Sequence, residues 1–296
     1  MPVVMKNCIF TVLALLFCTH WAAAQDDLLS LLGEEERTEY VTASFKTNRV
    51  INLHSLESTS KGVLDLKISH RFGFLSGGAY ELFGLDNAMI RIGFDYGITD
   101  QLTVGIGRSS FEKTFDGFAK YKFLRQSTGK RNVPISLALL GTTAIKSQRW
   151  QDPNRENYFS SRLYYTVQLI AGRKFSEGLS LQVSPTLVHR NLVATQAEAN
   201  DVYALGFAGR VKLTKRLAIN AEYIYVLPDQ LGPDYLNSFS IGFDIETGGH
   251  VFQLHFTNST SMIEKGYIAE TVGDWLDGDI HFGFNVSRVF TVAKKK

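Results

Sequence analysis

The chain has 296 residues, of which 45 % are hydrophobic and 20 % charged, and 31 Lys and Arg against 29 Asp and Glu leave a formal net charge of +2. This composition excludes an intrinsically disordered chain, and it lacks the basic surplus that nucleic-acid binding requires. No internal apolar run approaches the roughly eighteen residues of a membrane-spanning helix, which excludes a helical membrane bundle. We therefore expect a folded protein with no nucleic-acid partner.

The first 24 residues have the pattern of a secretory signal peptide. A basic residue precedes the apolar run Cys8–Cys18, and Ala22–Ala24 supplies the small residues that a signal peptidase needs. A lipid anchor on Cys18 is disfavoured because the bulky Phe17 precedes it. Cleavage before Gln25 would remove both cysteines of the chain. The mature protein would then have neither a disulfide nor a thiolate metal site.

From residue 63 onward, apolar and polar residues alternate with period two, which is typical of strands that have one apolar face. Ile92 and Phe94, for example, alternate with Arg91 and Asp95. The alternation predicts twelve strands, in the segments 64–69, 90–98, 102–109, 115–123, 133–145, 162–173, 179–189, 202–213, 217–225, 238–246, 251–257 and 280–287.

Strand length and loop length both indicate a membrane. Most of these segments are closer to the roughly 9–11 residues of a tilted membrane strand than to the five or six of a soluble sandwich. Short turns near 99–101, 176–178, 215–216 and 248–249 alternate with long loops at 74–87, 146–160, 191–200, 228–235 and 259–277. In lipid every backbone polar group must be paired, so the sheet must close. The predicted fold is all-β: a closed antiparallel transmembrane β-barrel of about twelve strands, with both termini in the periplasm.

The apolar face of the predicted strands carries no charge near mid-strand, where a charge would cost roughly 2–4 kcal/mol in a bilayer. Arg108, Arg173 and Arg288 share the parity of this face, but they stand at strand ends, where long side chains reach water. A soluble sandwich would also alternate, but it explains neither the strand length nor the loop asymmetry. Pro185 interrupts an otherwise regular strand and is expected to mark a bulge.

Residues 25–62 precede the first predicted membrane strand and form a separate segment. The acidic residues Asp26, Asp27 and Glu34–Glu36 cannot lie in hydrocarbon, so the segment is expected in the periplasm or in the lumen. It is also a possible contact for a periplasmic protein partner. The predicted organisation is a signal peptide at 1–24, this segment at 25–62 and an outer-membrane barrel at 63–296.

Several runs resemble an uncharacterised outer-membrane β-barrel family of Bacteroidota, a domain of unknown function. These runs are VTASFKTNRVIN at 41–52, GVLDLKISHRFG at 62–73, FGLDNA at 83–88, FDYGITD at 94–100, GIGRS at 105–109 and KYKFLRQS at 120–127. The resemblance implies the outer membrane of a Gram-negative bacterium, after cleavage of the signal peptide. It implies no catalytic or binding residues.

No enzyme and no cofactor are expected. A lipid hydrolase would need an activated serine on the lipid face. His70 and His189 share the parity of that face, but no orienting Asn or acid is expected beside them, and Ser109–Ser110 is the nearest serine pair. His255 and His281 fall on adjacent predicted strands with inward parity, and such isolated histidines are more often hydrogen-bonding residues than metal ligands.

The inward face carries the distinctive chemistry, because basic and acidic residues there are nearly matched. The inward basic residues are Lys67, Arg71, Arg91, Lys120, Lys122, Arg162, Arg210 and Lys212, and the acids are Asp65, Asp95, Asp116, Glu222, Asp244 and Glu246. We expect ion pairs to cross a narrow lumen, with the constriction formed by Arg91, Arg162 and Arg210 against Asp95, Glu222 and Asp244.

Two functions are compatible with such a lumen. One is a narrow polar pore in outer-membrane lipid that passes small solutes. The other is a closed scaffold that binds a partner through its loops or through residues 25–62. The mixed charge does not decide between them, because paired charges can either close a lumen or line a passage.

Overall fold

The computed structural model describes residues 37–150, 152–196 and 198–293, so the predicted signal peptide lies outside the described residues. The described chain divides into two compact units. A small unit holds residues 37–39 and 127–132, where β1 (Thr38–Tyr40) pairs with β6 (Ser127–Gly129). The other unit is much larger, contains residues 40–126 and 133–293, and includes every strand of the barrel.

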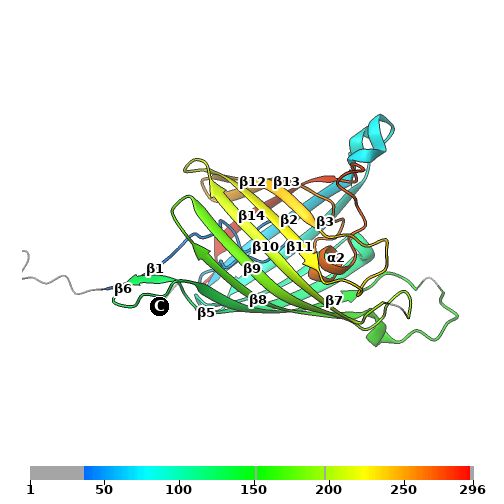
Figure 1. Ribbon diagram of the computed structural model, residues 1–296, viewed down its shortest axis with the longest axis horizontal. Helices are drawn as coiled ribbons and strands as arrows, with labels where there is room; N and C mark the ends of the chain where they lie inside the picture. Colours follow the sequence, from blue (N-terminus) through cyan, green and yellow to red (C-terminus); the bar gives the residue numbers. More distant parts are fainter. Residues whose placement is uncertain (1–36, 151, 197, 294–296) are drawn as a thin grey trace, which may run out of the picture. The chain divides into compact units, whose positions relative to one another are not determined.

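The large unit is a closed barrel of twelve antiparallel strands, as the sequence predicts (Figure 1). Each strand pairs with its neighbours in the chain, and closure comes from β14 on β2, in register at Val286 and Ile68. The strands are β2 (Val63–Phe74), β3 (Ala88–Gly97), β4 (Leu102–Ser109), β5 (Thr114–Leu124), β7 (Ser136–Lys146), β8 (Leu163–Lys174), β9 (Leu179–Arg190), β10 (Asp201–Lys212), β11 (Leu217–Val226), β12 (Phe239–Thr247), β13 (His250–Thr257) and β14 (His281–Thr291).

Four short helices lie in the connections between these strands. They are the 3₁₀ helices η1 (Leu75–Gly84), η2 (Phe111–Lys113) and η3 (Phe159–Arg162) and the α-helix α2 (Glu264–Ala269). Among the described residues, no helix combines the length and apolar character needed to cross a bilayer.

The two faces of the sheet differ as the alternation predicts. Along β9, Ser180, Gln182 and Ser184 are buried on the inner face, whereas Leu181 between them is exposed on the outer face. The outer face of the other strands is likewise apolar, with exposed Ile92, Phe94, Ile106, Val167, Phe207, Phe243 and Leu254. A barrel with an apolar exterior and paired backbone fits a hydrocarbon environment.

Two local features, both at prolines, differ from the sequence expectation. The strand expected from residue 133 begins instead at Ser136, because Pro134 has no N–H to donate to a ladder. Pro185 causes no bulge: it pairs with Leu205 in an unbroken register. The ladder between β8 and β9 lacks pairs at 184–185 but resumes in the same register, so the missing N–H costs hydrogen bonds without shifting the strand.

The connections distinguish two ends of the barrel. At the turn end, residues 98–101, 175–178, 213–216 and 248–249 join consecutive strands in short turns. At the loop end, the connections are mostly long, and the β13–β14 connection contains α2. Two connections depart from the expected alternation: residues 110–113 form a short one at the loop end, and 125–135 a long one at the turn end.

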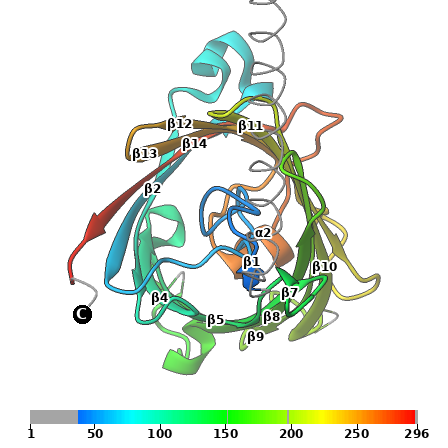
Figure 2. The same cartoon turned by 90° about the vertical axis from the view of Figure 1, so that its left-hand side faces the viewer.

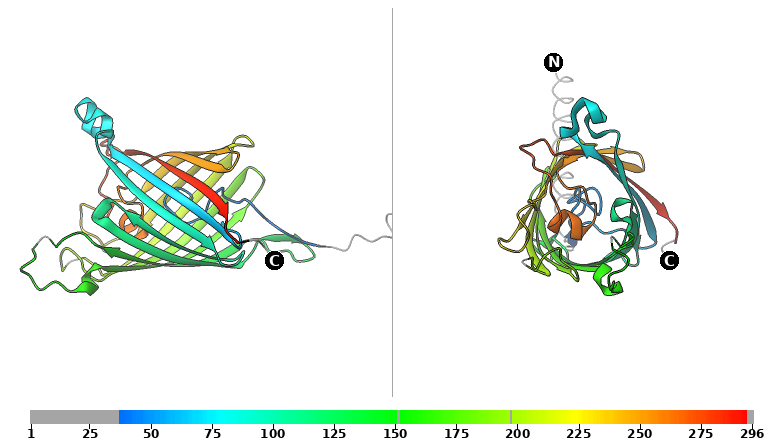
Figure 3. Two further views of the ribbon diagram at one scale, coloured as in Figure 1. Left: turned by 180° about the vertical axis from the view of Figure 1, so that it is seen from behind. Right: turned by 90° about the vertical axis from the view of Figure 1, so that its right-hand side faces the viewer.

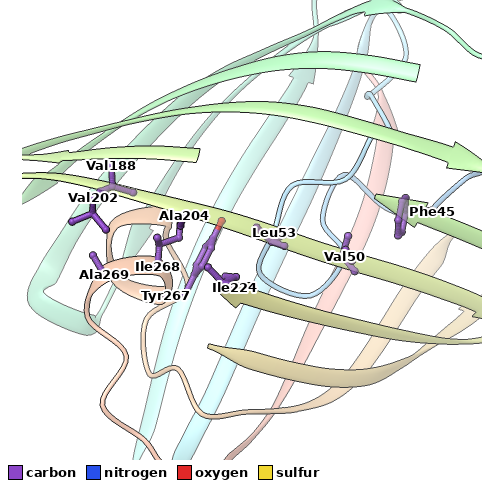
Figure 4. Close-up of a cluster of buried hydrophobic side chains, with 11 residues drawn as sticks. Phe45, Val50, Leu53, Val188, Val202, Ala204, Ile224, Tyr267, Ile268 and Ala269 are labelled. Carbon is purple, nitrogen blue, oxygen red and sulfur yellow. The ribbon is translucent and has the colours of Figure 1, made fainter. Parts of the chain in front are cut away.

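Two segments of the chain itself lie in the interior of the barrel. Viewed along the barrel, residues of the segment before β2 and helix α2 both lie inside the ring of strands (Figures 2 and 3). Every residue of α2 is buried. Phe45, Val50 and Leu53 of the preceding segment join Tyr267 and Ile268 of α2 in one apolar cluster against β9, β10 and β11 (Figure 4).

Two valines on the lipid face test the membrane orientation. Val167 lies well inside β8 and is 50 % exposed, whereas Val211 is next to the end of β10 and is 47 % exposed. Because an arginine at mid-bilayer is far from water, we expect Val167→Arg to lower the free energy of unfolding by about 2–4 kcal/mol and Val211→Arg by about 0–1 kcal/mol. Denaturant titration in lipid vesicles measures both, and equal effects would contradict this orientation.

Candidate functional site, a plugged lumen

Residues 44–59, here called the plug segment, fold back on themselves inside the barrel. The N–H of Val50 donates to the carbonyl of Leu53 at 2.7 Å, and the N–H of Ser55 donates to the carbonyl of Asn48 at 2.9 Å. The tip of this loop is therefore residues 50–53. No strand runs beside it, so its remaining backbone groups must find side-chain partners.

Glu222 on β11 binds the tip of the plug segment. Its carboxylate accepts the backbone N–H groups of three consecutive residues, Ile51 at 3.1 Å, Asn52 at 2.9 Å and Leu53 at 3.0 Å. The carboxylate is almost completely buried, and hydrogen bonds from N–H groups to an anion are stronger than those to a neutral acceptor. The tip thus forms an anion-binding nest that the barrel wall itself fills.

Lys120 on β5 binds both arms of the plug segment, and on the first arm it donates to the carbonyl of Asn48 at 3.5 Å. Its ammonium group donates to the carbonyls of Ser55 at 2.9 Å and Glu57 at 2.5 Å. Lys120 is fully buried, so these carbonyls replace the water that would otherwise solvate its charge. An inward lysine that looks like channel lining in the sequence is a structural contact of the plug.

Two glutamines make further contacts with the backbone of the plug segment. Gln182 on β9 accepts the N–H of Leu56 at 3.1 Å and donates to the carbonyl of His54 at 2.7 Å, in the way that a neighbouring strand would. Gln253 on β13 donates to the carbonyl of Val50. Side chains from strands on different sides of the barrel therefore hold one continuous stretch of the plug segment.

The plug segment is linked to α2 through Glu264. Arg49 donates to the Glu264 carboxylate at 2.6 Å, and the Tyr267 hydroxyl donates to the same oxygen at 3.3 Å. His54 Nε2 lies 3.4 Å from this oxygen. Burial, followed by the positive charge of Arg49, lowers the pKa of His54 well below its usual range. His54 is therefore neutral near pH 7, and the ion pair that joins the two elements is Arg49–Glu264.

A second charge cluster fixes α2 at the loop end. Lys265 donates to Glu112 of η2 at 2.5 Å and to Glu270 at 2.6 Å, and Lys146 also binds Glu112. Burial by itself would raise the pKa of Glu112, but Lys265 and Lys146 outweigh it and hold that pKa below its usual range. The short β4–β5 connection thus anchors the helix that closes the barrel from the loop end.

The charged residues expected at the constriction form ion pairs with other residues of the barrel wall, and not across the lumen. Arg91 pairs with Asp116 on β5 instead of with Asp95, and Asp95 pairs with Lys67 at 3.2 Å. Arg91 reaches Asp116 because its side chain lies over Gly107 on the strand between them. A Cβ at Gly107 would collide with the Arg91 guanidinium.

The other constriction candidates do not form the predicted pairs either. Arg162 lies in η3, before β8, and donates to the carbonyl of Lys146 at 2.7 Å, so its expected position inside a strand is wrong. Arg210 is half-buried on β10 and has no ion pair within 4.0 Å among the described residues. Asp244 accepts from Gln253 at 2.7 Å. The plug segment and α2, not ion pairs between opposite walls, fill this lumen.

The sequence contains a signal for the plug segment that strand patterning does not use. Val50, Ile51, Leu53 and Leu56 place four large apolar residues within seven positions of a segment that is not a strand. Such a cluster needs a protein interior, and a membrane barrel offers one only in its lumen.

Two of the histidines considered as catalytic or metal-binding residues, His189 and His281, have other partners, whereas neither ring nitrogen of His255 has a hydrogen-bond partner among the described residues. His189 is oriented by Asp201 at 2.6 Å, contrary to expectation, because the two residues face each other across β9 and β10. Its second nitrogen, however, contacts the amide of Asn191 at 2.9 Å and not a serine hydroxyl. Both nitrogens of His281 are engaged, with Thr260 and with a backbone carbonyl. Within the described part of the chain, no group of three or more His, Cys, Asp or Glu residues could hold a metal ion.

Residues 45–290 match a family described as membrane bound beta barrel domain, DUF5777. The protein belongs to this family. The matched region begins at residue 45 and so includes nearly the whole plug segment as well as the barrel. The protein is therefore a membrane β-barrel whose family domain carries the plug together with the wall that binds it.

Solved structures of other barrels are similar to this chain at low sequence identity. The NanC porin has a TM-score of 0.47 and 7 % identity over 77 % of this chain and 98 % of its own. The COG4313 outer membrane channel from Pseudomonas putida F1 has a TM-score of 0.46 and 13 % identity over 80 % of this chain and 98 % of its own. Omp33 from Acinetobacter baumannii has a TM-score of 0.41 and 8 % identity over 77 % of this chain and 97 % of its own. No curated protein matches the chain.

Glu222 offers a direct test of how the plug segment is held. Glu222→Gln keeps the size of the side chain but removes the charge that binds three N–H groups, a change worth about 1.5–3 kcal/mol. We expect hydrogen exchange at residues 51–53 to accelerate at least tenfold, measured by mass spectrometry in detergent. The control is Glu177→Gln, whose side chain is 84 % exposed and pairs with Lys174 at the turn end, outside the plug segment. Unchanged exchange in Glu222→Gln would contradict the assigned role.

Proposed function

We propose that the protein is an outer-membrane channel for small polar solutes and that the plug segment holds it closed. The observation that carries the proposal is the polarity of the wall beneath the plug. The inner face there consists largely of buried polar side chains, including Thr103, Lys120, Gln168, Gln182, Asn220 and Ser240. A barrel that only had to stay sealed could be filled with apolar side chains, whereas this wall would be wetted once the plug left.

The contacts of the plug suit a segment that can leave. Its hydrogen bonds to Glu222, Lys120 and Gln182 can be replaced by water, so each contributes only about 0.5–1.5 kcal/mol net, or somewhat more where a charge is involved. The apolar cluster around Val50 and Leu53 supplies the remaining stabilisation of the closed state. We infer that a modest free energy separates the closed and open barrels.

The location of the protein and its orientation in the membrane are inferred from the sequence. A signal peptide at 1–24, a plug-bearing segment at 25–62 and a barrel at 63–296 suit an outer-membrane protein of a Gram-negative bacterium. Short turns usually face the periplasm, so we assign the turn end to that side. The plug segment then enters from the periplasm, and α2 closes the barrel from the outside.

The solute class follows from the width of the barrel and from its lining. Eight strands leave an interior filled by side chains and sixteen or more leave a wide channel, so twelve strands give an intermediate bore. With polar and charged groups on the inner face, small hydrophilic solutes are the expected cargo. No enzymatic step is part of this proposal.

Replacement of the plug segment tests the proposal. We expect a variant in which residues 46–57 become a Gly–Ser chain of equal length to conduct at least fivefold more than the wild type in a planar bilayer. The reason is that the linker lacks both the apolar cluster and the backbone geometry that binds Glu222. A Gly–Ser replacement of residues 77–83 in η1, which lies outside the plug, should leave the conductance unchanged.

The contrary result would be a plug-replaced barrel that still shows heat-modifiable migration on a gel, and is therefore folded, but does not conduct. This outcome would reject the proposal that the plug segment holds a channel closed, and it would favour the closed scaffold that binds a partner. In that case the exposed loop residues, and not the lumen, would carry the function.

A further inference from the structure

A small pocket lies between the plug segment and the wall formed by β2, β3 and β14, and positive charge gathers around it. Four cationic side chains line it, Arg49 from the plug and Lys67, Arg71 and Arg91 from the wall. The other lining residues are Ile51, Asn52, Ser69, Met262 and Asn285. None of these residues is acidic, so the pocket has four cationic side chains in its lining and no carboxylate.

Three of the four cations have acidic partners that do not line the pocket. The ion pairs are Arg49–Glu264 at 2.6 Å, Lys67–Asp95 at 3.2 Å and Arg91–Asp116. These carboxylates pair with the three cations but do not line the pocket, so the pocket itself contains no anionic side chain.

Arg71 on β2 is the exception. Only 1 % of its surface is exposed, and its Nη2 donates to the side-chain carbonyl of Asn52. Its Nε and Nη1 have no hydrogen-bond partner among the described residues. Glu222 attracts Arg71, but the carboxylate of Glu222 is already bound by the three N–H groups of the plug tip. A buried guanidinium with two unused donors is strongly unfavourable unless an anion completes its coordination.

We propose that this pocket binds a small monovalent anion, a halide ion, beside the Arg71 guanidinium. Arg49, Lys67 and Arg91 raise the electrostatic potential at the site, and the Ser69 hydroxyl supplies a further donor. The space holds about one water-sized group, so a single halide ion is the largest anion expected there and a polyanion does not fit.

An adjoining pocket gives the anion a route. It shares Arg49, Ile51, Lys67, Ser69 and Asn285 with the first pocket and continues along Val251 and Ser287, which lie toward the turn end. The anion would therefore enter beside the plug segment and bridge it to β2. Occupancy of the site would stabilise the plugged state.

Bromide binding to the purified wild-type protein tests the site. In crystals soaked in sodium bromide, we expect an anomalous peak in contact with the Arg71 guanidinium. In detergent solution, bromide should raise Tm above its value in gluconate at the same ionic strength, because an ion that binds only the folded state stabilises it by mass action. Gluconate is too large for the pocket and serves as the non-binding anion.

Variants then assign the effect to Arg71. We expect Arg71→Gln to lose the anomalous peak and at least half of the bromide-dependent rise in Tm, while Arg71→Lys, which keeps the charge, retains part of the rise. Arg210→Gln removes an inward arginine that does not line the pocket and should behave as wild type. If Arg71→Gln does not fold, the wild-type peak decides the question.

The proposal is overturned if bromide gives no peak at Arg71 in the wild type, or if Arg71→Gln folds and keeps both the peak and the full rise in Tm. None of these measurements uses conductance. Failure of the channel proposal would therefore leave this test intact, and failure of the anion site would leave the channel test intact.

Discussion

The backbone of the plug segment sets the constraint on which the interior of this barrel depends. A non-helical chain inside a closed sheet has no strand beside it, yet its N–H and C=O groups are removed from water and must be paired. Glu222 pairs the amides of the tip, and Lys120 and Gln182 pair the groups of the arms. The polar inner face is thus complementary to a particular stretch of backbone, and this explains why a membrane barrel buries so many polar side chains.

Backbone N–H and C=O groups must be paired on both the lipid side and the lumen side of the barrel wall, but the partners differ between the two sides. Toward lipid, closure of β14 on β2 leaves no free sheet edge, and the outer face can be wholly apolar. Toward the lumen, side chains take over the role of a neighbouring strand. Elements from the two ends then meet at Glu264, where Arg49 of the plug binds the helix that comes from the loop end. Two segments that are distant in the chain therefore fill the lumen together, and this ion pair is one of the contacts that join them.

Much of the fold could be predicted from the sequence, because the requirements that lipid places on a strand appear in the residue pattern of each short segment. Period-two alternation, strand length and loop asymmetry are properties of short segments, and they lead to twelve strands and a closed sheet. The partners of the inward charges could not be predicted in this way. Parity shows that Arg91 faces inward, but only the absence of a side chain at Gly107 lets it reach Asp116.

The role of Glu222 was still less accessible to sequence reasoning. Its partners are backbone groups about 170 residues away, and a backbone amide leaves no trace in a residue pattern. Arg162 illustrates the opposite difficulty: its parity fits a strand, but the 3₁₀ turn before β8 takes it out of the wall. Pairing between side chains can be guessed from charge, whereas pairing between a side chain and an irregular backbone requires the fold.

Crosslinking of the plug tip to the wall tests the central claim most directly. Asn52 Nδ2 donates to Ser240 Oγ at 3.0 Å, so cysteines at the two positions should be joined by a short thiol crosslinker in native membranes. With Cys8 and Cys18 replaced and a protease site inserted at 153–155, the account predicts that Asn52→Cys with Ser240→Cys keeps the two fragments joined on a denaturing gel. Asn52→Cys with Ser176→Cys, at an exposed turn, should not. Fragments of the first pair that separate as fully as those of the second would contradict a plugged lumen.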